Sequence, residues 1–325
     1  MQLITYICIF GLLIIGFCAF YLIKLQIEAS TKLQTDIALQ ETKIANMRQT
    51  VVEKQDEISR IEQEFQTADR DLKSSIQYAE RIQRAIIPQE IEFKTLFPDC
   101  FIYFSPRDIV SGDFYTCASM RDCKIAIVAD CTGHGVPGGL LSMLGMSALK
   151  DLLSKPTSIN ELNPGEILDE LRKFIITSLA EADETDDSSI NDGMDITICV
   201  FNNDMTQIRY ATANHTIYVA RNGEITKLKG CRMPIGRHPK QDEPFESFSF
   251  DLQHGDRVYM CSDGIQDQFG SEENIKFSTK RLVSMLQANC NKDTQSQYAE
   301  ISKYVDDWKI GREQFDDQTL IGIKI

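Results

Sequence analysis

Apolar and polar residues follow three successive patterns along this chain. The first, residues 3–23, is a continuous apolar run of 21 residues without a charge. As a helix it would span about 30 Å, the thickness of a membrane's hydrocarbon core, so we expect a membrane-spanning anchor. A cleaved signal peptide is one alternative, but Met1 and Gln2 give it no basic leader, and no small-residue cleavage site is visible. A buried core helix is the other, and the polar stretch that follows leaves it little to pack against.

The second pattern is a heptad repeat in residues 26–87, a stretch without Gly or Pro. The repeat has two lines of residues that could face a partner helix, and one of them is almost wholly apolar. The other, its companion seam, is interrupted by Gln40, Lys54 and Ser75, and like charges would face each other beside it in a parallel pair. We therefore expect a long helix that forms a weak or regulated homodimer, with a solvated single helix as the alternative. Pro88 ends the helix. The apolar seam recurs every seven residues at Ile37, Ile44, Val51, Ile58, Phe65, Leu72, Ala79 and Ile86.

The third pattern begins after Pro88 and consists of short strands and helices. Four helices are expected at residues 139–153, 164–179, 279–288 and 295–308, with Asn163 as the N-cap of the second. Strands and helices come in blocks, which favours an α+β sandwich over a doubly wound parallel sheet. The acidic segment 181–193 has few apolar residues and is predicted to be a mobile loop. Strands are predicted at residues 101–104, 124–129, 196–201, 207–213, 216–220, 248–252, 257–261 and 320–325.

These patterns divide the chain into an anchor (residues 1–25), a coiled-coil linker that could act as a switch (26–92) and a globular domain (93–325). Lys24 and Lys32 follow the apolar run, and no Lys or Arg precedes it. By the positive-inside rule we expect a single-pass protein of the plasma or inner membrane, with the globular domain in the cytoplasm.

Composition narrows the function classes. The formal net charge is -14 and the pI is about 4.8, which excludes a typical nucleic-acid binder because phosphate affinity needs clustered Lys and Arg. The ten cysteines include no C-x-x-C pair, so a zinc ribbon and a thioredoxin-like site have no support. Several lie in apolar runs, which indicates unpaired thiols in a reducing compartment.

Four aspartates stand at predicted strand ends or turns. Asp113 lies in the string SGDF, Asp130 follows the run 125–129, Asp263 follows the run 257–262, and Asp316 precedes the last strand. A strand that stops on Asp and turns through Gly places a carboxylate at the rim of a sheet. Mg²⁺ and Mn²⁺ prefer such oxygen ligands, and water bound to them can attack phosphorus. Asp and Gly are also ordinary turn residues, but four such positions indicate a metal site.

The strings around these aspartates are similar to one known family. In order, they are SSIQYAERIQRAIIP (74–88), PRDIVSGDFY (106–115), ADCTGHGVPG (129–138), DGMD (192–195), PIG (234–236), SDGIQDQ (262–268) and DDQT (316–319). Together they resemble the SpoIIE-type phosphatase domain, the bacterial branch of the metal-dependent (PPM, type 2C) serine/threonine protein phosphatases. The match covers the chain from about residue 74 onward.

This resemblance implies an α+β fold in which two packed β-sheets are flanked by helices, with two Mn²⁺ or Mg²⁺ ions at one end of the sandwich. It implies that Asp130 bridges both ions. Asp113 and the backbone carbonyl of Cys131 would bind one ion, and Asp263 and Asp316 the other. It also implies direct attack by water without a phospho-enzyme.

Two positions depart from the pattern of many eukaryotic relatives. Thr132 stands where they carry a His, and no motif places an Arg against the phosphate. His134 is therefore a candidate general acid, with a structural or merely exposed His as the alternative. Asn214 and His215 are candidates for the substrate side of the site. Asp195 in the GMD string could support a further metal or position the acidic loop.

The function predicted from these observations is hydrolysis of phosphoserine or phosphothreonine on a cytoplasmic regulatory protein, for instance an antagonist in a sigma-factor pathway. One alternative is a catalytically inactive, membrane-anchored scaffold on a phosphatase fold, against which the four intact aspartates argue. The other is a membrane adaptor that works through its coiled coil, against which the long motif-bearing domain argues.

Overall fold

The structure is a computed structural model that describes residues 1–156, 158–180, 192–271 and 275–325. Most of the acidic segment that we predicted to be mobile, residues 181–191, lies outside the described residues. The chain divides into two units, Met1–Leu72 and Lys73–Ile325, which we describe separately.

The first unit is helical from Gln2 onward and belongs to α1 (Gln2–Ile86). Within the described residues, one helix is long and apolar enough to cross a membrane, with a segment of mean hydropathy 2.6 near the N-terminus. The heptad residues Ile37 and Ile44 are each 49% exposed in the single chain. Pairing of this helix and its insertion into a membrane stay predictions.

The second unit contains two antiparallel sheets. The five-stranded sheet has the order β1-β11-β10-β6-β7, and the six-stranded sheet has the order β2-β3-β4-β5-β9, with β8 paired to β4. The first sheet is formed by β1 (Cys100–Ser105), β6 (Thr216–Arg221), β7 (Glu224–Lys229), β10 (Arg257–Cys261) and β11 (Gln318–Lys324). The second is formed by β2 (Phe114–Ser119), β3 (Cys123–Cys131), β4 (Gly193–Asn202), β5 (Gln207–Ala213), β8 (Ile235–Gly236) and β9 (Phe248–Asp251).

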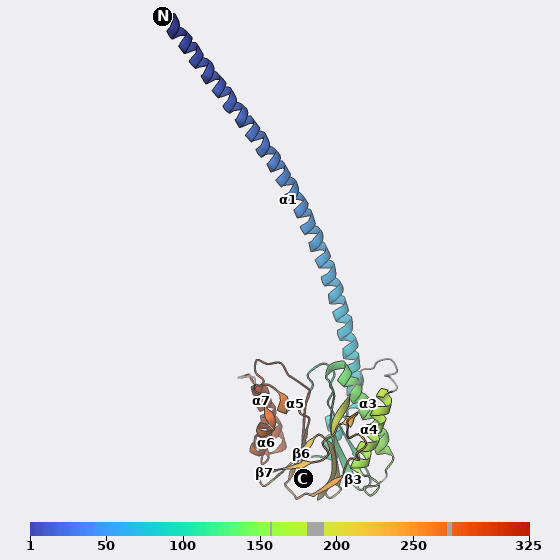
Figure 1. The fold of residues 1–325 in the computed structure, drawn as a ribbon. Helices are drawn as coiled ribbons and strands as arrows, with labels where there is room; N and C mark the ends of the chain where they lie inside the picture. Colours follow the sequence, from blue (N-terminus) through green and yellow to red (C-terminus); the bar gives the residue numbers. More distant parts are fainter. Residues whose placement is uncertain (157, 181–191, 272–274) are drawn as a thin grey trace. The chain divides into compact units, whose positions relative to one another are not determined.

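Helices cover the outer faces of both sheets, so the unit has four layers (Figure 1). The first helices are α2 (Glu90–Leu96), α3 (Gly135–Ser154) and α4 (Pro164–Ala180), and α3 and α4 cover the six-stranded sheet. Then come α5 (Gly264–Asp267), α6 (Ser278–Asn289) and α7 (Thr294–Trp308), which cover the five-stranded sheet. The predicted α+β sandwich flanked by helices is confirmed.

Strand β3 shows why the sandwich forms. Ile125 and Ile127 pack against the helices α3 and α4, whereas Ala126 and Val128 pack between the sheets. Successive side chains of a strand point to opposite faces, so a strand buried on both faces needs a continuous apolar run. Residues 125–129 provide that run.

Several element predictions are confirmed and some elements were missed. The N-cap of α4 is confirmed, because the Gly165 amide donates to Asn163 Oδ1 over 3.1 Å. Strands β2, β7 and β8 and the short helices α2 and α5 were missed. Strand β7 lies at a sheet edge, and its apolar residues Ile225 and Leu228 are three positions apart, which breaks the two-residue period that identifies strands.

Candidate metal centre

The four aspartates singled out in the sequence come together at one end of the sandwich, and we call them the carboxylate cluster. Asp130 lies near the end of β3, and Asp113 precedes β2, whose first residue Phe114 pairs with Ala129. Asp263 follows β10, and Asp316 precedes β11, which runs antiparallel to β10. Each sheet therefore contributes two aspartates from neighbouring antiparallel strands.

Asp113 is the most deeply buried member of the cluster, at 1% exposed. Its Oδ2 accepts hydrogen bonds of 2.6 Å from both Ser262 Oγ and Thr319 Oγ1, which belong to the opposite sheet and its connections. Its Oδ1 has no hydrogen-bond partner among the described residues. Burial raises the pKa of Asp113 to about 8, although the two hydroxyl donors oppose that shift. A buried carboxylate oxygen without a hydrogen-bond partner is available as a ligand for a cation.

Asp130 lies at the electrostatic centre of the cluster. Its pKa is raised well above the ordinary value by burial and then by the charges of Asp113, Asp263 and Asp316, with a further contribution from Asp195. Like-charged carboxylates at close range favour either proton uptake or a bound cation. The oxygen-only donor set suits a hard divalent ion such as Mg²⁺ or Mn²⁺.

The cluster is open rather than closed. Across the described ranges, no three His, Cys, Asp or Glu side chains form a ready-made metal cage. Asp263 is exposed and Asp130 and Asp316 are half-buried, so solvent reaches the cluster from one side. Mg²⁺ commonly keeps several water ligands and uses only one or two carboxylates, so an open cluster fits such an ion better than a closed cage would.

A fifth aspartate, Asp317, holds the loop that carries Asp113. Asp317 is 2% exposed, and its Oδ2 and Oδ1 accept hydrogen bonds of 2.7 Å from the amides of Gly112 and Arg107. Burial raises the pKa of Asp317, and those two amide donors oppose the shift. Sequence reasoning did not assign it a role, although its place beside Asp316 in DDQT was a visible signal.

Two glycines allow the chain segments of the cluster to approach one another. A Cβ on Gly112 would lie 2.6 Å from the Gly133 carbonyl oxygen and 3.2 Å from that of Cys131. A Cβ on Gly264 would lie 1.9 Å from the Asp317 carbonyl oxygen. A side chain at either position would push the aspartate-bearing loops apart. The close approach also brings the Cys131 carbonyl, a predicted ligand, against the loop that carries Asp113.

Gln83, near the end of α1, is a further residue that sequence reasoning missed. It is 3% exposed, and its Nε2 donates to the Ser111 carbonyl over 2.6 Å and to Ser142 Oγ over 2.8 Å. The Ser111 amide donates back to Gln83 Oε1 over 3.1 Å. The last turns of α1 are thus joined to the residue two positions before Asp113. A lone Gln in a heptad helix gives no sequence signal for such a contact.

The histidine candidates occupy different surroundings. His134 precedes α3 and is about half exposed, and its Nδ1 lies 2.7 Å from Asp108 Oδ2. His215 is buried in the turn between β5 and β6. The neighbouring Asn214 donates to Asp195 Oδ1 over 2.9 Å. Burial raises the pKa of Asp195 to about 6, and the Asn214 bond opposes that shift.

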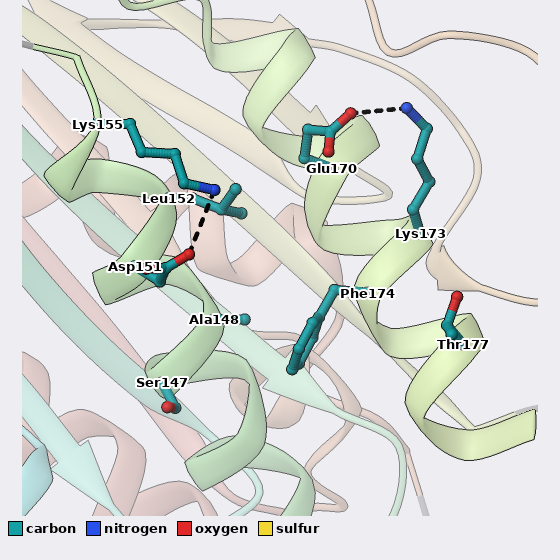
Figure 2. A pocket seen from close by; sticks show the side chains of 9 residues that line it. All are labelled: Ser147, Ala148, Asp151, Leu152, Lys155, Glu170, Lys173, Phe174 and Thr177. Atoms are coloured by element: carbon teal, nitrogen blue, oxygen red, sulfur yellow. Dashed lines mark hydrogen bonds and ion pairs between the residues drawn. The ribbon is translucent and has the colours of Figure 1, made fainter. Parts of the chain in front are cut away.

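The hollow between α3 and α4, of about 460 Å³, shows a different arrangement of charges. Figure 2 shows that its charged side chains point toward partners on their own helices. Lys155 pairs with Asp151 over 3.2 Å, and Lys173 pairs with Glu170 over 2.6 Å. This α3–α4 hollow therefore offers apolar surface and neutralised charges, with no carboxylate cluster.

Comparison with known proteins agrees with this geometry. The family described as Stage II sporulation protein E (SpoIIE) matches residues 121–325. The chain belongs to the SpoIIE family. The fold of this SpoIIE-family chain is that of PP2C-type phosphatases, and its similarity to the metal-dependent serine/threonine phosphatase domain is confirmed. No curated protein is significantly similar to the chain in sequence.

Three solved structures are similar to this SpoIIE-family chain. The SiaA-PP2C domain of Pseudomonas aeruginosa has 28% identity and a TM-score of 0.70, with 79% of this chain and 98% of that chain covered. The phosphatase domain and regulatory fragment of SpoIIE from Bacillus subtilis has 17% identity and a TM-score of 0.55, covering 70% and 62%. The RsbU and RsbW domains of a Mycobacterium tuberculosis protein have 16% identity and a TM-score of 0.54, covering 70% and 59%. The last two similarities concern the fold alone.

Proposed function

We propose that this chain is an active, metal-dependent protein serine/threonine phosphatase. The observation that carries the proposal is the fully buried Asp113 carboxylate, whose Oδ1 has no partner among the described residues, inside a cluster of four aspartates. An apolar or fully paired end of the sandwich would be more stable, so this arrangement favours a site that holds cations.

The proposed ligand set follows the positions of the aspartates. Asp130, whose carboxylate interacts with the other three, would bridge two ions of Mn²⁺ or Mg²⁺. Asp113 and the Cys131 carbonyl would hold one ion, and Asp263 and Asp316 the other. When bound, such ions make a coordinated water acidic enough to act as a nucleophile and neutralise phosphoryl oxygens.

The remaining residues position this machinery. Ser262 and Thr319 fix the orientation of the Asp113 carboxylate by donating to its Oδ2. Asp317 holds the preceding loop through the Gly112 amide. His134 is the proposed proton donor to the leaving Ser or Thr oxygen, since its ring is half exposed and its Nδ1 is held 2.7 Å from Asp108 Oδ2.

The proposed substrate is a phosphorylated regulatory protein of the cytoplasm, with an antagonist in a sigma-factor pathway as the example that the family resemblance supports. We propose that the apolar start of α1 anchors the chain in the plasma or inner membrane by a single span. Its length and hydropathy support that placement. The anchor would occupy residues 1–25 and the linker residues 26–92, leaving residues 93–325 as the phosphatase domain.

Phosphate release by the full chain in detergent micelles tests the function. We expect hydrolysis of an aryl phosphate and of a phosphothreonine peptide in the presence of Mn²⁺ or Mg²⁺, and none in a strong chelator. Selective removal of zinc should change nothing, because the donor set has no His and Cys at zinc spacing. Full activity in chelator would refute the metal assignment. Absence of activity with every divalent ion would favour the inactive scaffold.

We also propose that pairing of α1 regulates the site. The heptad seam supports a weak homodimer, and Gln83 links the end of α1 to the loop before Asp113. A weakly paired helix has two states of similar free energy, which a switch requires.

Replacing Gln40, Lys54 and Ser75 with Leu tests this regulation. The substitutions complete the companion seam, so they should give a firm dimer with higher specific activity at low protein concentration. Sedimentation and phosphate release measure the two effects. A firm dimer whose specific activity equals that of a shortened chain beginning at Lys73 would show that the helix is only a spacer.

A further inference from the structure

A second hollow, of about 360 Å³, adjoins the carboxylate cluster at Asp263 and also touches Asp195. Its wall includes Lys227 and Lys229 from β7 and His215 from the turn between β5 and β6. We call it the lysine cavity. These three residues are outside the proposed ligand set, so the metal chemistry does not account for them.

The two lysines share one face of the five-stranded sheet. Lys227 pairs with Tyr218 and Lys229 pairs with Thr216 in the register of β6 and β7, and residues two apart in a strand point to the same side. Tyr218 and Thr216 also line the lysine cavity. Neither lysine forms an ion pair with any residue that the structure describes, and Lys227 Nζ lies 5.9 Å from the centroid of the Tyr218 ring. Two unneutralised positive charges therefore stand beside an acidic site in a chain of net charge -14.

His215 gives an independent sign that the lysine cavity receives a ligand. It is 8% exposed, and both of its ring nitrogens lack hydrogen-bond partners within the described part of the chain. Burial lowers the pKa of His215 to about 4, so the ring is neutral near pH 7 and has one N–H to donate. Buried polar groups of native proteins are normally paired, so this imidazole, whose two nitrogens are both buried, would meet an acceptor in the hollow after a turn of its ring.

We propose that the lysine cavity binds the carboxylate of an acidic residue that lies a few positions from the phosphorylated Ser or Thr of the protein substrate. This inference rests on the proposed phosphatase function, since Asp263 is shared by the cavity wall and the carboxylate cluster. A carboxylate carries one charge, so Asp195 and Asp263 repel it less than they would repel a second phosphate. The lysines supply its counter-charges and His215 its hydrogen bond.

An alternative explanation for the two lysines is that they lie on an edge strand, where charged residues discourage pairing with other chains. That effect predicts no influence on substrate choice. The two explanations therefore differ in their consequences for kinetics with peptides of different charge.

The experiment compares two phosphothreonine peptides that are identical except for Glu or Gln on both sides of the phosphothreonine. The full chain in detergent micelles should hydrolyse the Glu peptide with a KM about tenfold lower than that of the Gln peptide. The double variant Lys227→Gln, Lys229→Gln should lose this difference with little change in kcat. Its activity on an aryl phosphate, which has no flanking residue, should equal that of the unchanged chain.

A matched double variant controls for the loss of positive charge. Lys280 on α6 and Lys303 on α7 are exposed and do not line the lysine cavity. Lys280→Gln with Lys303→Gln removes the same charge and should keep the preference for the Glu peptide. An unchanged preference in the Lys227 and Lys229 variant, or no preference in the unchanged chain, would overturn the proposal.

Direct binding separates this proposal from the proposed function. Fluorescence anisotropy of the labelled Glu peptide measures affinity in the absence of turnover. If the unchanged chain has no phosphatase activity but binds the Glu peptide in a way that the Lys227 and Lys229 variant loses, the phosphatase function fails and the subsite stands. If it hydrolyses both peptides equally and the variant binds them equally, the subsite fails and the function stands.

Discussion

The carboxylate cluster and the α3–α4 hollow both place charged side chains beside open space, but they treat those charges in opposite ways. In the hollow, Lys155 and Lys173 each pair with an acidic residue on their own helix. In the cluster, Asp130 is surrounded by three further carboxylates. The lysine cavity, which adjoins the cluster at Asp263, has a volume of about 360 Å³. The α3–α4 hollow is larger, at about 460 Å³.

Unsatisfied charge is therefore a better guide to a functional site than the size of an opening. Paired surface charges contribute little free energy, and two helices packed side by side often leave a shallow hollow. Buried like charges destabilise the fold, so a protein that retains them uses them.

The largest effect is expected for Asp130→Asn. Removing the central carboxylate lowers metal affinity and leaves the coordinated water less acidic, so activity on an aryl phosphate should fall by roughly a thousandfold, or about 4 kcal/mol. Asp263→Asn and Asp316→Asn should cause large but smaller losses. Circular dichroism should show that all three variants are folded. Unchanged phosphate release by Asp130→Asn would contradict the assignment of the cluster.

Gln83→Leu should have an intermediate effect. The substitution keeps the side-chain volume but leaves the Ser111 amide without its partner, which we expect to cost about 1–3 kcal/mol of unfolding free energy. The loop before Asp113 would loosen, so half-maximal activity should need about tenfold more Mn²⁺. Gln77→Leu, on an exposed position of the same helix, is the matched control. Equal metal requirements for the two variants would show that Gln83 has no influence on the site.

A smaller effect concerns stability against pH in the absence of metal. The pKa of Asp113 is raised from 3.8 to about 8, so the folded state binds its proton more tightly than the unfolded state does. This stabilisation is complete below 3.8 and is lost as the pH rises through 8. In chelator, the Tm should therefore fall as the pH rises between these values, and Asp113→Asn should flatten the slope.

Added Mn²⁺ should reverse this dependence, because the ion competes with the proton for the same oxygens. Thermal unfolding at several pH values, with chelator and with Mn²⁺, measures both slopes. A chelated protein whose Tm rises steadily toward alkaline pH would contradict the protonated state of Asp113.

The smallest effect is expected in the α3–α4 hollow. Lys173→Gln with Glu170→Gln removes an exposed pair that solvent screens, so the midpoint of urea unfolding and the activity should both stay unchanged. Arg172 lies next to this pair but is buried, and it bonds Asp169 and the Glu243 carbonyl over 2.7 Å each. As a contrast to this smallest effect, Arg172→Gln in the same helix leaves Asp169 without its partner and should cost about 3–5 kcal/mol of unfolding free energy, measured by urea unfolding. Loss of activity in the Lys173 and Glu170 variant would assign the hollow a role that its paired charges do not suggest.

The sequence predicted the sandwich and the positions of the four aspartates because both depend on local patterns. Continuous apolar runs marked strands such as β3, and Asp beside Gly marked the strand ends. The supports of the site depend on distant segments. Ser262 and Thr319 lie 149 and 206 positions from Asp113, and no local pattern announces that their hydroxyls meet its carboxylate.

Gln83 and the lysine cavity were hidden for related reasons. Gln83 interrupts no pattern in its helix, and its contact with Ser111 depends on how the helix end packs. Lys227 and Lys229 lie in a strand that the sequence did not reveal, so their shared face could not be inferred. The sequence makes His215 a substrate-side candidate, but only the structure shows that its ring is buried and has no hydrogen-bond partner among the described residues.

The position of β11 bears on how the protein is made. This strand lies between β1 and β10, and it begins two residues after Asp316, although β1 is synthesised more than two hundred residues earlier. Pairing across such a separation is slow, so β1 must wait with an open edge until the end of the chain arrives. A chain interrupted before residue 316 lacks both the strand that closes the sheet and one carboxylate of the cluster. If the proposed metal site is correct, an incomplete copy therefore cannot complete it, and the site forms only after the last strand has joined the sheet.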